Sequence, residues 1–251
     1  MIGVKIRNIQ KTFGSQVVLR DISLDIEAGE MIAIVGPSGT GKSVMLKIIT
    51  GLMSPDSGEV YIGDECMTVL ASGARRQHLA ERLGVLFQGA ALLDSMTLYD
   101  NLAFPLRYRG GFSRKEIQRR CFKCLGEVGL IGYENALPGE VSIGIKKRLG
   151  IARALITEPD VILFDEPNTG LDPEAGQEIY DLIKHTKKIS GCTGIVISHE
   201  IPEVFQVCDR VVMLYQGMVE ASGSIDEFLG SKSEVVQQFV KGSVEGPIEI
   251  Q

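Results

Sequence analysis

The stretch Gly36-Pro37-Ser38-Gly39-Thr40-Gly41-Lys42-Ser43 decides the fold of this chain. It follows the unbroken apolar run 31–35 and precedes residues 44–49, whose pattern predicts a helix. The spacing G-x-x-x-x-G-K-S lets the backbone curl with its N–H groups pointing inward, and the helix adds the positive end of its dipole. We therefore predict a phosphate loop (residues 36–43) that binds a nucleoside triphosphate, with Lys42 at the β- and γ-phosphates and the Ser43 hydroxyl on the accompanying Mg²⁺.

Length and charge narrow the class of protein. The chain has 251 residues, 44% of them hydrophobic, which suits one large α/β domain or two closely joined lobes. Its net charge of −6 and pI near 5.2 argue against a nucleic-acid partner, which would need a basic face. The sequence shows neither a run of about 18 apolar residues nor a leader pattern. We therefore expect a soluble, cytoplasmic chain.

The five cysteines are an odd number, scattered along the sequence. This arrangement favours reduced thiols over a disulfide framework. Cys121 and Cys124 form a C-x-x-C, which is compatible with redox chemistry or with half of a zinc site. They lie in a stretch of helical period, and no second Cys/His pair follows at ligand spacing. The favoured interpretation is two small apolar side chains on one helix face.

The hydrophobic pattern predicts a fold of several parts. Alternation predicts antiparallel strands on either side of a turn at 14–16, and short apolar runs predict buried parallel strands. The strand signal fades after residue 89, where helical periodicity replaces it. Strands are predicted at 4–9, 17–26, 31–35, 161–164, 193–198, 211–214 and 218–222, and helices at 113–128, 225–229 and 235–241. The fold class is α/β: a P-loop NTPase parallel sheet with an antiparallel β edge subdomain and an inserted helical lobe.

Two carboxylates follow the apolar strand at 161–164. Asp165 and Glu166 come directly after it, so in a P-loop sheet they lie at the edge where ligands bind. We expect Asp165 to hold Mg²⁺ and Glu166 to polarise the water that attacks the γ-phosphate. An acidic turn at a strand end is the plainer alternative. The adjacent pair favours hydrolysis over transfer to another acceptor.

These motifs resemble those of ATP-binding-cassette (ABC) ATPases from about Val4 to Leu229. The resemblance implies an aromatic contact to adenine by Phe13, a small apolar contact by Val18, and a Q-loop glutamine at Gln88 that reaches the metal. It implies a D-loop at Gly170-Leu171-Asp172 and a switch histidine at His199. It also implies one ATPase domain over 1–241, divided into a core (1–88 and 146–241) and a helical signature lobe (89–145).

The signature segment (residues 141–145) departs from the family pattern. L-S-G-G-Q is usual, and here the sequence is Val141-Ser142-Ile143-Gly144-Ile145. Ser142 and Gly144 match the positions that contact the γ-phosphate held by the opposite subunit, at the start of a helix expected near Lys146. Ile143 replaces a glycine that permits close backbone approach, so we expect weaker or slower closure of the two subunits around ATP.

The resemblance also implies partners. Each ATP lies between two copies, so the working unit is a homodimer, and its motion acts on integral-membrane permease subunits that dock on the helical lobe. Residues 86–106 and 238–247 resemble the ATPase subunits of MCE-type (Mla-type) phospholipid transporters. This implies phospholipid cargo, an MCE-domain protein as a further component, and a place on the cytoplasmic face of the inner membrane. The tail (residues 242–251) is expected to contact a partner subunit.

Two other functions stay open. One is a nucleotide-gated regulatory module whose turnover is low because of Ile143 and Ile145. The other is a soluble ABC ATPase for DNA repair or iron–sulfur assembly, which the acidic charge and the lack of a cysteine ligand set disfavour. The basic residues of the helix at 113–128 fit a solvated face better than contact with an acidic permease loop. These residues are Arg114, Lys115, Arg119, Arg120 and Lys123.

Overall fold

A sheet of six strands, in the order β10-β9-β3-β8-β7-β6, forms the centre of the structure, a computed structural model that describes residues 1–70, 73, 79 and 81–248. Five of these strands run parallel, and β10 is antiparallel to β9. The strands are β3 (Met31–Val35), β6 (Leu83–Leu86), β7 (Val161–Asp165), β8 (Thr193–Ile197), β9 (Arg210–Tyr215) and β10 (Met218–Gly223). The parallel strands predicted from unbroken apolar runs are confirmed, because every residue of β3 and β8 is buried.

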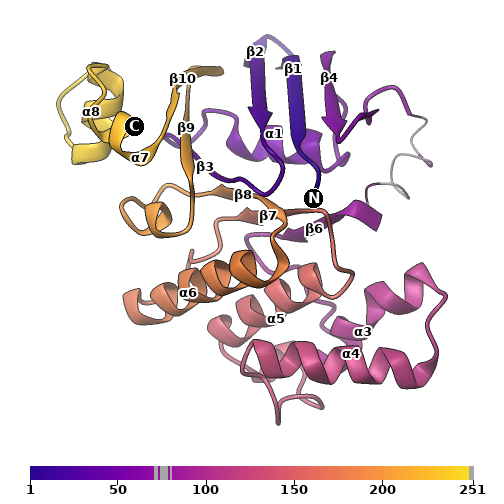
Figure 1. The fold of residues 1–251 in the computed structure, drawn as a ribbon. Coiled ribbons are helices and arrows are strands. Elements are labelled where there is room, and N and C mark those ends of the chain that lie inside the picture. Colours follow the sequence, from indigo (N-terminus) through magenta and orange to yellow (C-terminus); the bar gives the residue numbers. More distant parts are fainter. Residues whose placement is uncertain (71–72, 74–78, 80, 249–251) are drawn as a thin grey trace.

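Apolar layers cover both faces of the central sheet. Ile32 and Ile34 of β3 pack with α1 (Lys42–Ile49) and the second sheet, whereas Met31, Ala33 and Val35 pack on the other face with α6 (Pro173–Ser190). Figure 1 shows α1 between the two sheets and α6 on the opposite side of the central sheet. This arrangement places the segments that follow the carboxyl ends of the strands along one edge.

The second sheet is antiparallel and has four strands in the order β2-β1-β4-β5. Its strands are β1 (Val4–Phe13), β2 (Gln16–Ile26), β4 (Ser57–Ile62) and β5 (Glu65–Cys66). The predicted antiparallel pair is confirmed as β1 and β2. Sequence reasoning missed β4, which begins Ser57-Gly58 and buries only Val60 and Ile62.

The helical lobe has an apolar cluster of its own. It contains α3 (Leu98–Arg109), α4 (Arg114–Glu127) and part of α5 (Ile143–Leu155). The predicted helix at 113–128 is confirmed as α4, which begins after Ser113, whose side chain accepts a hydrogen bond from the Glu116 N–H. Cys121 and Cys124 are buried in the cluster, and burial raises their pKa values to about 11 and about 12.

The basic face of α4 is paired locally. Arg119 and Arg120 both bind the Glu116 carboxylate, and these hydrogen bonds lower its pKa to about 2. Lys123 lies 3.6 Å from Glu127. The exposed pairs agree with a solvated face and contribute little to stability individually.

Helix α5 begins earlier than predicted. The sequence placed its start near Lys146, but Ser142 is its N-cap and Ile143 its first residue. The reason is local, because the Ser142 hydroxyl accepts a hydrogen bond from the Ile145 N–H. Leu149 and Ala152 of α5 pack in the helical lobe, whereas Ile151 and Ala154 pack on the central sheet. The division of the chain at residues 145 and 146 stays a prediction.

The C-terminal segment completes the central layer. Helices α7 (Ile225–Leu229) and α8 (Glu234–Lys241) confirm the predicted helices, and β9 and β10 confirm the strands predicted at 211–214 and 218–222 and pair antiparallel. Short 3₁₀ helices lie at Pro138–Glu140 and Glu203–Gln206. Beyond α8 the tail folds back onto its own chain. The buried Gln238 side chain accepts from the Ile248 N–H at 2.6 Å and donates to its carbonyl at 3.0 Å. Residues 249–251 of the predicted tail lie outside the described residues, and its partner contact stays a prediction.

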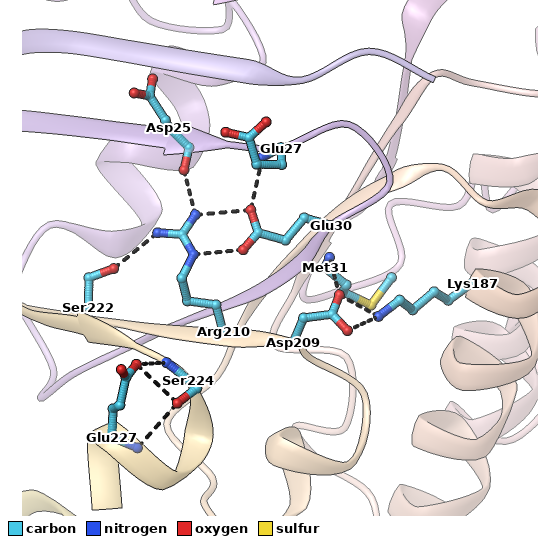
Figure 2. Close-up of polar contacts among 10 residues, drawn as sticks. All are labelled: Asp25, Glu27, Glu30, Met31, Lys187, Asp209, Arg210, Ser222, Ser224 and Glu227. Carbon is cyan, nitrogen blue, oxygen red and sulfur yellow. Dashed lines mark hydrogen bonds and ion pairs between the residues drawn. The ribbon is translucent and has the colours of Figure 1, made fainter.

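Charged side chains pair closely at the amino ends of β3 and β9 (Figure 2). Arg210 Nε and Nη2 donate to the two carboxylate oxygens of Glu30 at 2.6 and 3.0 Å. Arg210 also donates to the Asp25 carbonyl of β2 and to the Ser222 hydroxyl of β10. Next to it, Lys187 of α6 donates to Asp209 Oδ1 at 2.6 Å. These contacts join both sheets and α6 at one edge.

Candidate nucleotide site

The phosphate loop joins the carboxyl end of β3 to α1. Gly36, Gly39 and Gly41 have φ angles of 141°, 79° and 98°, which favour glycine. At two of these positions the surroundings also exclude a side chain. A Cβ at Gly36 would lie 2.2 Å from the Leu214 carbonyl oxygen, and one at Gly41 would lie 2.6 Å from Leu19 Cδ2. The tight curl predicted from the glycine spacing is therefore present.

Lys42 is held by backbone carbonyls of this loop. Its side chain is buried, and its Nζ donates to the Gly36 carbonyl at 2.6 Å and to the Pro37 carbonyl at 2.8 Å. Thr40 Oγ1 donates to the same Pro37 carbonyl at 3.0 Å. Burial lowers the pKa of Lys42, while Glu166 and Asp165 act to raise it. The outer residues Ser38, Gly39 and Ser43 are exposed.

Asp165, the last residue of β7, carries an unpaired buried atom. Within the described part of the chain, its Oδ1 is buried and has no hydrogen-bond partner. Burial raises the pKa of Asp165, and the neighbouring Glu166 raises it further. Strand β7 also contacts α1, the helix that carries Lys42 and Ser43. A buried carboxylate oxygen without a donor is suited to a cation.

The structure brings Glu166 and His199 together. His199 Nδ1 lies 2.6 Å from Glu166 Oε2, and the imidazole is half exposed. Thr169 Oγ1 donates to the same Glu166 oxygen at 2.7 Å. Glu166 has a φ of 49°, which a residue with a side chain rarely adopts. Sequence reasoning missed Thr169, whose only signal is its place three residues after the glutamate.

The remaining residues predicted for the core lie on three separate segments. Gln88 follows β6, and its side chain is exposed. Val18 of β2 lies beside the phosphate loop, because a Cβ at Gly41 would be 3.3 Å from Val18 Cγ1. Phe13 ends β1 with 45% of its surface exposed, and the Lys11 ammonium lies 5.6 Å from its ring centre. An exposed aromatic ring is free to stack on a base.

The signature segment and the D-loop form a second group. Gly144 lies beside Leu171, since a Cβ at Gly144 would be 3.9 Å from Leu171 Cδ2. Asp172 is the N-cap of α6, and its Oδ1 accepts from the Ala175 N–H at 2.9 Å. Among the described residues, no hydrogen bond or ion pair joins Ser142, Gly144 or Asp172 to the phosphate loop. Within the described residues, these two groups are therefore not bonded to each other directly.

Among residues 1–70, 73, 79 and 81–248, no cluster of three or more His, Cys, Asp or Glu side chains is arranged as a metal site. The same residues include no helix with the length and apolar character needed to cross a bilayer. A phosphate loop beside a carboxylate pair is suited instead to polyphosphate with its accompanying cation, and to attack on it by water.

Known proteins share this arrangement. The ABC transporter family matches residues 19–169. The chain is 40% identical to protein TRIGALACTOSYLDIACYLGLYCEROL 3, chloroplastic, of Arabidopsis thaliana, over 98% of this chain and 75% of that protein. It is 34% identical to the intermembrane phospholipid transport system ATP-binding protein MlaF of Haemophilus influenzae, over 98% and 92%. Other relatives are named for ribonucleotide, methionine or sulfate/thiosulfate transport.

A solved structure agrees with the sequence relatives. The dimeric ATP-binding cassette MJ0796, in a post-hydrolysis state bound to ADP and Pi, superposes with a TM-score of 0.81 at 33% identity. The superposition covers 88% of this chain and 98% of that one. Together with the phosphate loop and the carboxylate edge, these matches show that the chain belongs to the ABC transporter family, as an ATPase that binds and hydrolyses ATP.

Proposed function

We propose that this ATPase drives phospholipid movement by a membrane transporter, as a homodimer that docks on integral-membrane permease subunits. The observation that carries the catalytic part is the carboxyl edge of the sheet. There Lys42 is fixed by two carbonyls, one Asp165 oxygen has no partner among the described residues, and Glu166 is oriented by His199 and Thr169.

Each residue of this edge has a role in the proposal. Lys42 and the loop N–H groups bind the phosphates of ATP, and Phe13 and Val18 contact the adenine. Glu166 takes the proton of the attacking water, and His199 holds the Glu166 carboxylate in place. Gln88 reaches the same centre from the loop after β6.

The donors present fit Mg²⁺. Asp165 supplies an unpaired carboxylate oxygen and Ser43 a hydroxyl on the first turn of α1. Mg²⁺ is usually held by one or two protein oxygens together with substrate phosphates and water, so a larger protein cluster is not required. When bound, the ion would neutralise charge that develops on the phosphates. Ser43, Asp165 and Gln88 are the residues proposed to hold it.

The dimer is proposed because, within the described residues, no hydrogen bond or ion pair joins the signature segment to the phosphate loop of its own chain. The signature segment of one copy would complete the phosphate loop of another, with the Ser142 hydroxyl and the Gly144 N–H at the start of α5 facing the γ-phosphate. Asp172 would lie at the same interface. The dimeric state of the solved relative supports this proposal. Ile143 is 51% exposed, so its side chain would stand in the contact.

Cargo is proposed from similarity alone. Residues 86–106 and 238–247 resemble MCE-type ATPases, and the MlaF relative is named for intermembrane phospholipid transport. An MCE-domain protein would be the further component, and the complex would lie on the cytoplasmic face of the inner membrane. Relatives named for ribonucleotide or methionine transport define the alternative cargo that the transport experiment must distinguish.

Glu166→Gln tests the catalytic and dimer proposals together. We expect phosphate release to fall by at least about 100-fold, because the proton acceptor is lost, while ATP binding persists. Size-exclusion chromatography with light scattering in ATP and Mg²⁺ should then show a trapped dimer. A variant that binds ATP and stays monomeric would contradict the shared site. If wild-type turnover with the membrane subunits present does not exceed that of Glu166→Gln, the regulatory module is supported instead.

The cargo proposal needs the assembled complex. Membrane subunits that co-purify with the tagged chain after detergent extraction would be reconstituted in proteoliposomes. We expect ATP-dependent transfer of a fluorescent phospholipid to acceptor vesicles, with the Glu166→Gln complex as control. Transport of methionine or sulfate without lipid transfer would contradict phospholipid cargo and leave the ATPase assignment intact. Absence of any membrane subunit would favour a soluble ABC ATPase.

A further inference from the structure

A buried ammonium group joins three segments around the active edge. Lys147 lies on α5 and is only 2% exposed, although its side chain carries a charge. Its Nζ donates to the Gln88 carbonyl and, at 3.0 Å, to the Glu166 carbonyl. A lysine this deeply buried is unusual and requires partners that offset its lost hydration. Both partners belong to segments proposed to act in hydrolysis.

The segments that Lys147 holds are conformationally strained. Glu166 has a φ of 49°, and the turn after Gln88 contains Ala90 and Ala91 at 59° and 47°. Such backbone angles are unfavourable for residues that carry a side chain, so the surroundings must hold these residues in place. Arg153, six residues after Lys147 on the same helix, donates to the carbonyls of Ala90 and Ala91, each at 2.7 Å. Unlike Arg153, Lys147 also donates to the Glu166 carbonyl.

Electrostatics agree with this placement. Burial lowers the pKa of Lys147, whereas the nearby carboxylates of Asp165 and Glu166 act to raise it. The ammonium therefore lies in the field of both carboxylates while its donated hydrogen bonds go to backbone oxygens. The Glu166 carboxylate itself contacts His199 and Thr169.

Helix α5 also links this contact to the rest of the molecule. Its first residues belong to the signature segment, and its apolar side chains pack both in the helical lobe and on the central sheet. A shift of α5 relative to β7 would move Lys147 Nζ away from the Glu166 carbonyl. The backbone angle that aims the Glu166 side chain would then lose its support.

We propose that Lys147 is a positioning residue for ATP hydrolysis, which fixes the backbone of Glu166 and ties it to Gln88 and to the signature helix. It does not touch the reacting atoms. Its effect is to hold the Glu166 carboxylate where it can accept a proton from water, and misplacement of such a group by about 1 Å can cost roughly 100-fold in rate.

The first test is Lys147→Met in the full chain, because methionine keeps an apolar stem and loses the donors. We expect kcat for phosphate release to fall at least about 10-fold, with KM for ATP and the Kd for a fluorescent ATP analogue within about twofold of wild type. Lys147→Gln, whose amide has two N–H donors, should recover part of the rate. Lys184→Met removes the same charge from an exposed position of α6 and should leave kcat unchanged.

The second test separates positioning from general damage. In a Glu166→Gln background, Lys147→Met should cause little further loss in single-turnover rate, because the group that Lys147 positions is already disabled. Damage to packing or to ATP binding would instead lower the rate by the same factor in both backgrounds. Should Lys147→Met fail to fold, Lys147→Gln is judged by the same cycle.

Three results would overturn the proposal. The first is wild-type kcat in a folded Lys147→Met protein. The second is a fall in kcat matched by an equal loss of ATP affinity. The third is full additivity with Glu166→Gln. Arg153→Met, which releases only the Ala90 and Ala91 carbonyls, gives a further comparison and should lower kcat less than Lys147→Met.

Discussion

Charged side chains are bonded differently at the amino-end edge and at the carboxyl-end edge of the central sheet. At the amino ends of β3 and β9, carboxylates and cations pair side chain to side chain, as Glu30 does with Arg210 and Asp209 with Lys187 (Figure 2). At the carboxyl ends, Lys42 donates to backbone carbonyls, while Asp165 keeps a buried oxygen without a partner in the described residues. The charged groups named at the first edge bond to one another, whereas at the second edge one buried oxygen of Asp165 has no partner among the described residues. The difference agrees with a structural role for the first edge and with the proposed ligand-binding role of the second.

Lys42→Ala gives the largest expected effect on this comparison. Loss of the charge that is proposed to lie opposite the β- and γ-phosphates should reduce phosphate release at least about 100-fold and weaken ATP binding. The matched control at the other edge is Lys187→Ala, which should retain ATP affinity and turnover. Isothermal titration with ATP and a phosphate-release assay measure both variants. Unchanged nucleotide affinity in Lys42→Ala would contradict the assignment of the phosphate loop.

Arg210→Met tests the amino edge. The variant leaves Glu30 partly buried without its bidentate partner and breaks the contacts to Asp25 and Ser222. We expect the free energy of unfolding to fall by about 1–3 kcal/mol. Denaturant titration measures this loss, and KM for ATP should stay within about twofold. A large rise in KM with little loss of stability would remove the distinction between the two edges.

The pH dependence of stability sharpens the same point. Burial alone would raise the pKa of Glu30, but the hydrogen bonds from Arg210 and from the Glu27 N–H outweigh it, so the pKa is lowered from its usual 4.5. A lowered pKa means that the contribution is present above 4.5 and is lost as pH falls through the lower, folded-state value. Glu30→Gln should therefore flatten the acid side of the stability curve, by on the order of 1 kcal/mol. Equal slopes below pH 4.5 in denaturant titrations of both proteins would contradict this.

Thr169→Val is the smallest expected change. It keeps the shape of the side chain and removes the hydroxyl that donates to Glu166 Oε2. Loss of one such hydrogen bond is worth about 0.5–1.5 kcal/mol, so kcat should fall about 3- to 10-fold with KM for ATP unchanged. A loss of stability without any change in kcat would assign Thr169 to the fold instead of the site.

Much of this architecture is predictable from the sequence, for identifiable reasons. Fully buried parallel strands such as β3 and β8 appear in the sequence as unbroken apolar runs, and the spacing of the glycines indicates the phosphate loop. Strand β4 was missed because glycine and serine open it. Helix α3 was missed because its polar and apolar residues are weakly segregated and it contains Pro105.

The site divides in the same way. Lys42, Asp165, Glu166 and His199 can be proposed from the sequence because each stands in a motif or directly after a predicted strand. Lys147 has no such signal, because its proposed role depends on backbone carbonyls 59 and 19 residues away in sequence. No local pattern encodes such a contact. The left-handed φ of Glu166 was likewise out of reach, since a side-chain-bearing residue gives no sign of it.

The clasp between Gln238 and Ile248 has a practical consequence for handling the protein. The Gln238 side-chain amide accepts a hydrogen bond from the Ile248 N–H and donates one to the Ile248 carbonyl. The Tyr215 hydroxyl donates to the Pro247 carbonyl at 2.8 Å. Ending the chain before residue 247 would leave the buried Gln238 amide without its Ile248 partner and would expose the apolar end of α8. A purification handle or fluorescent label is therefore best fused after Gln251, with a flexible spacer, so that this clasp stays closed.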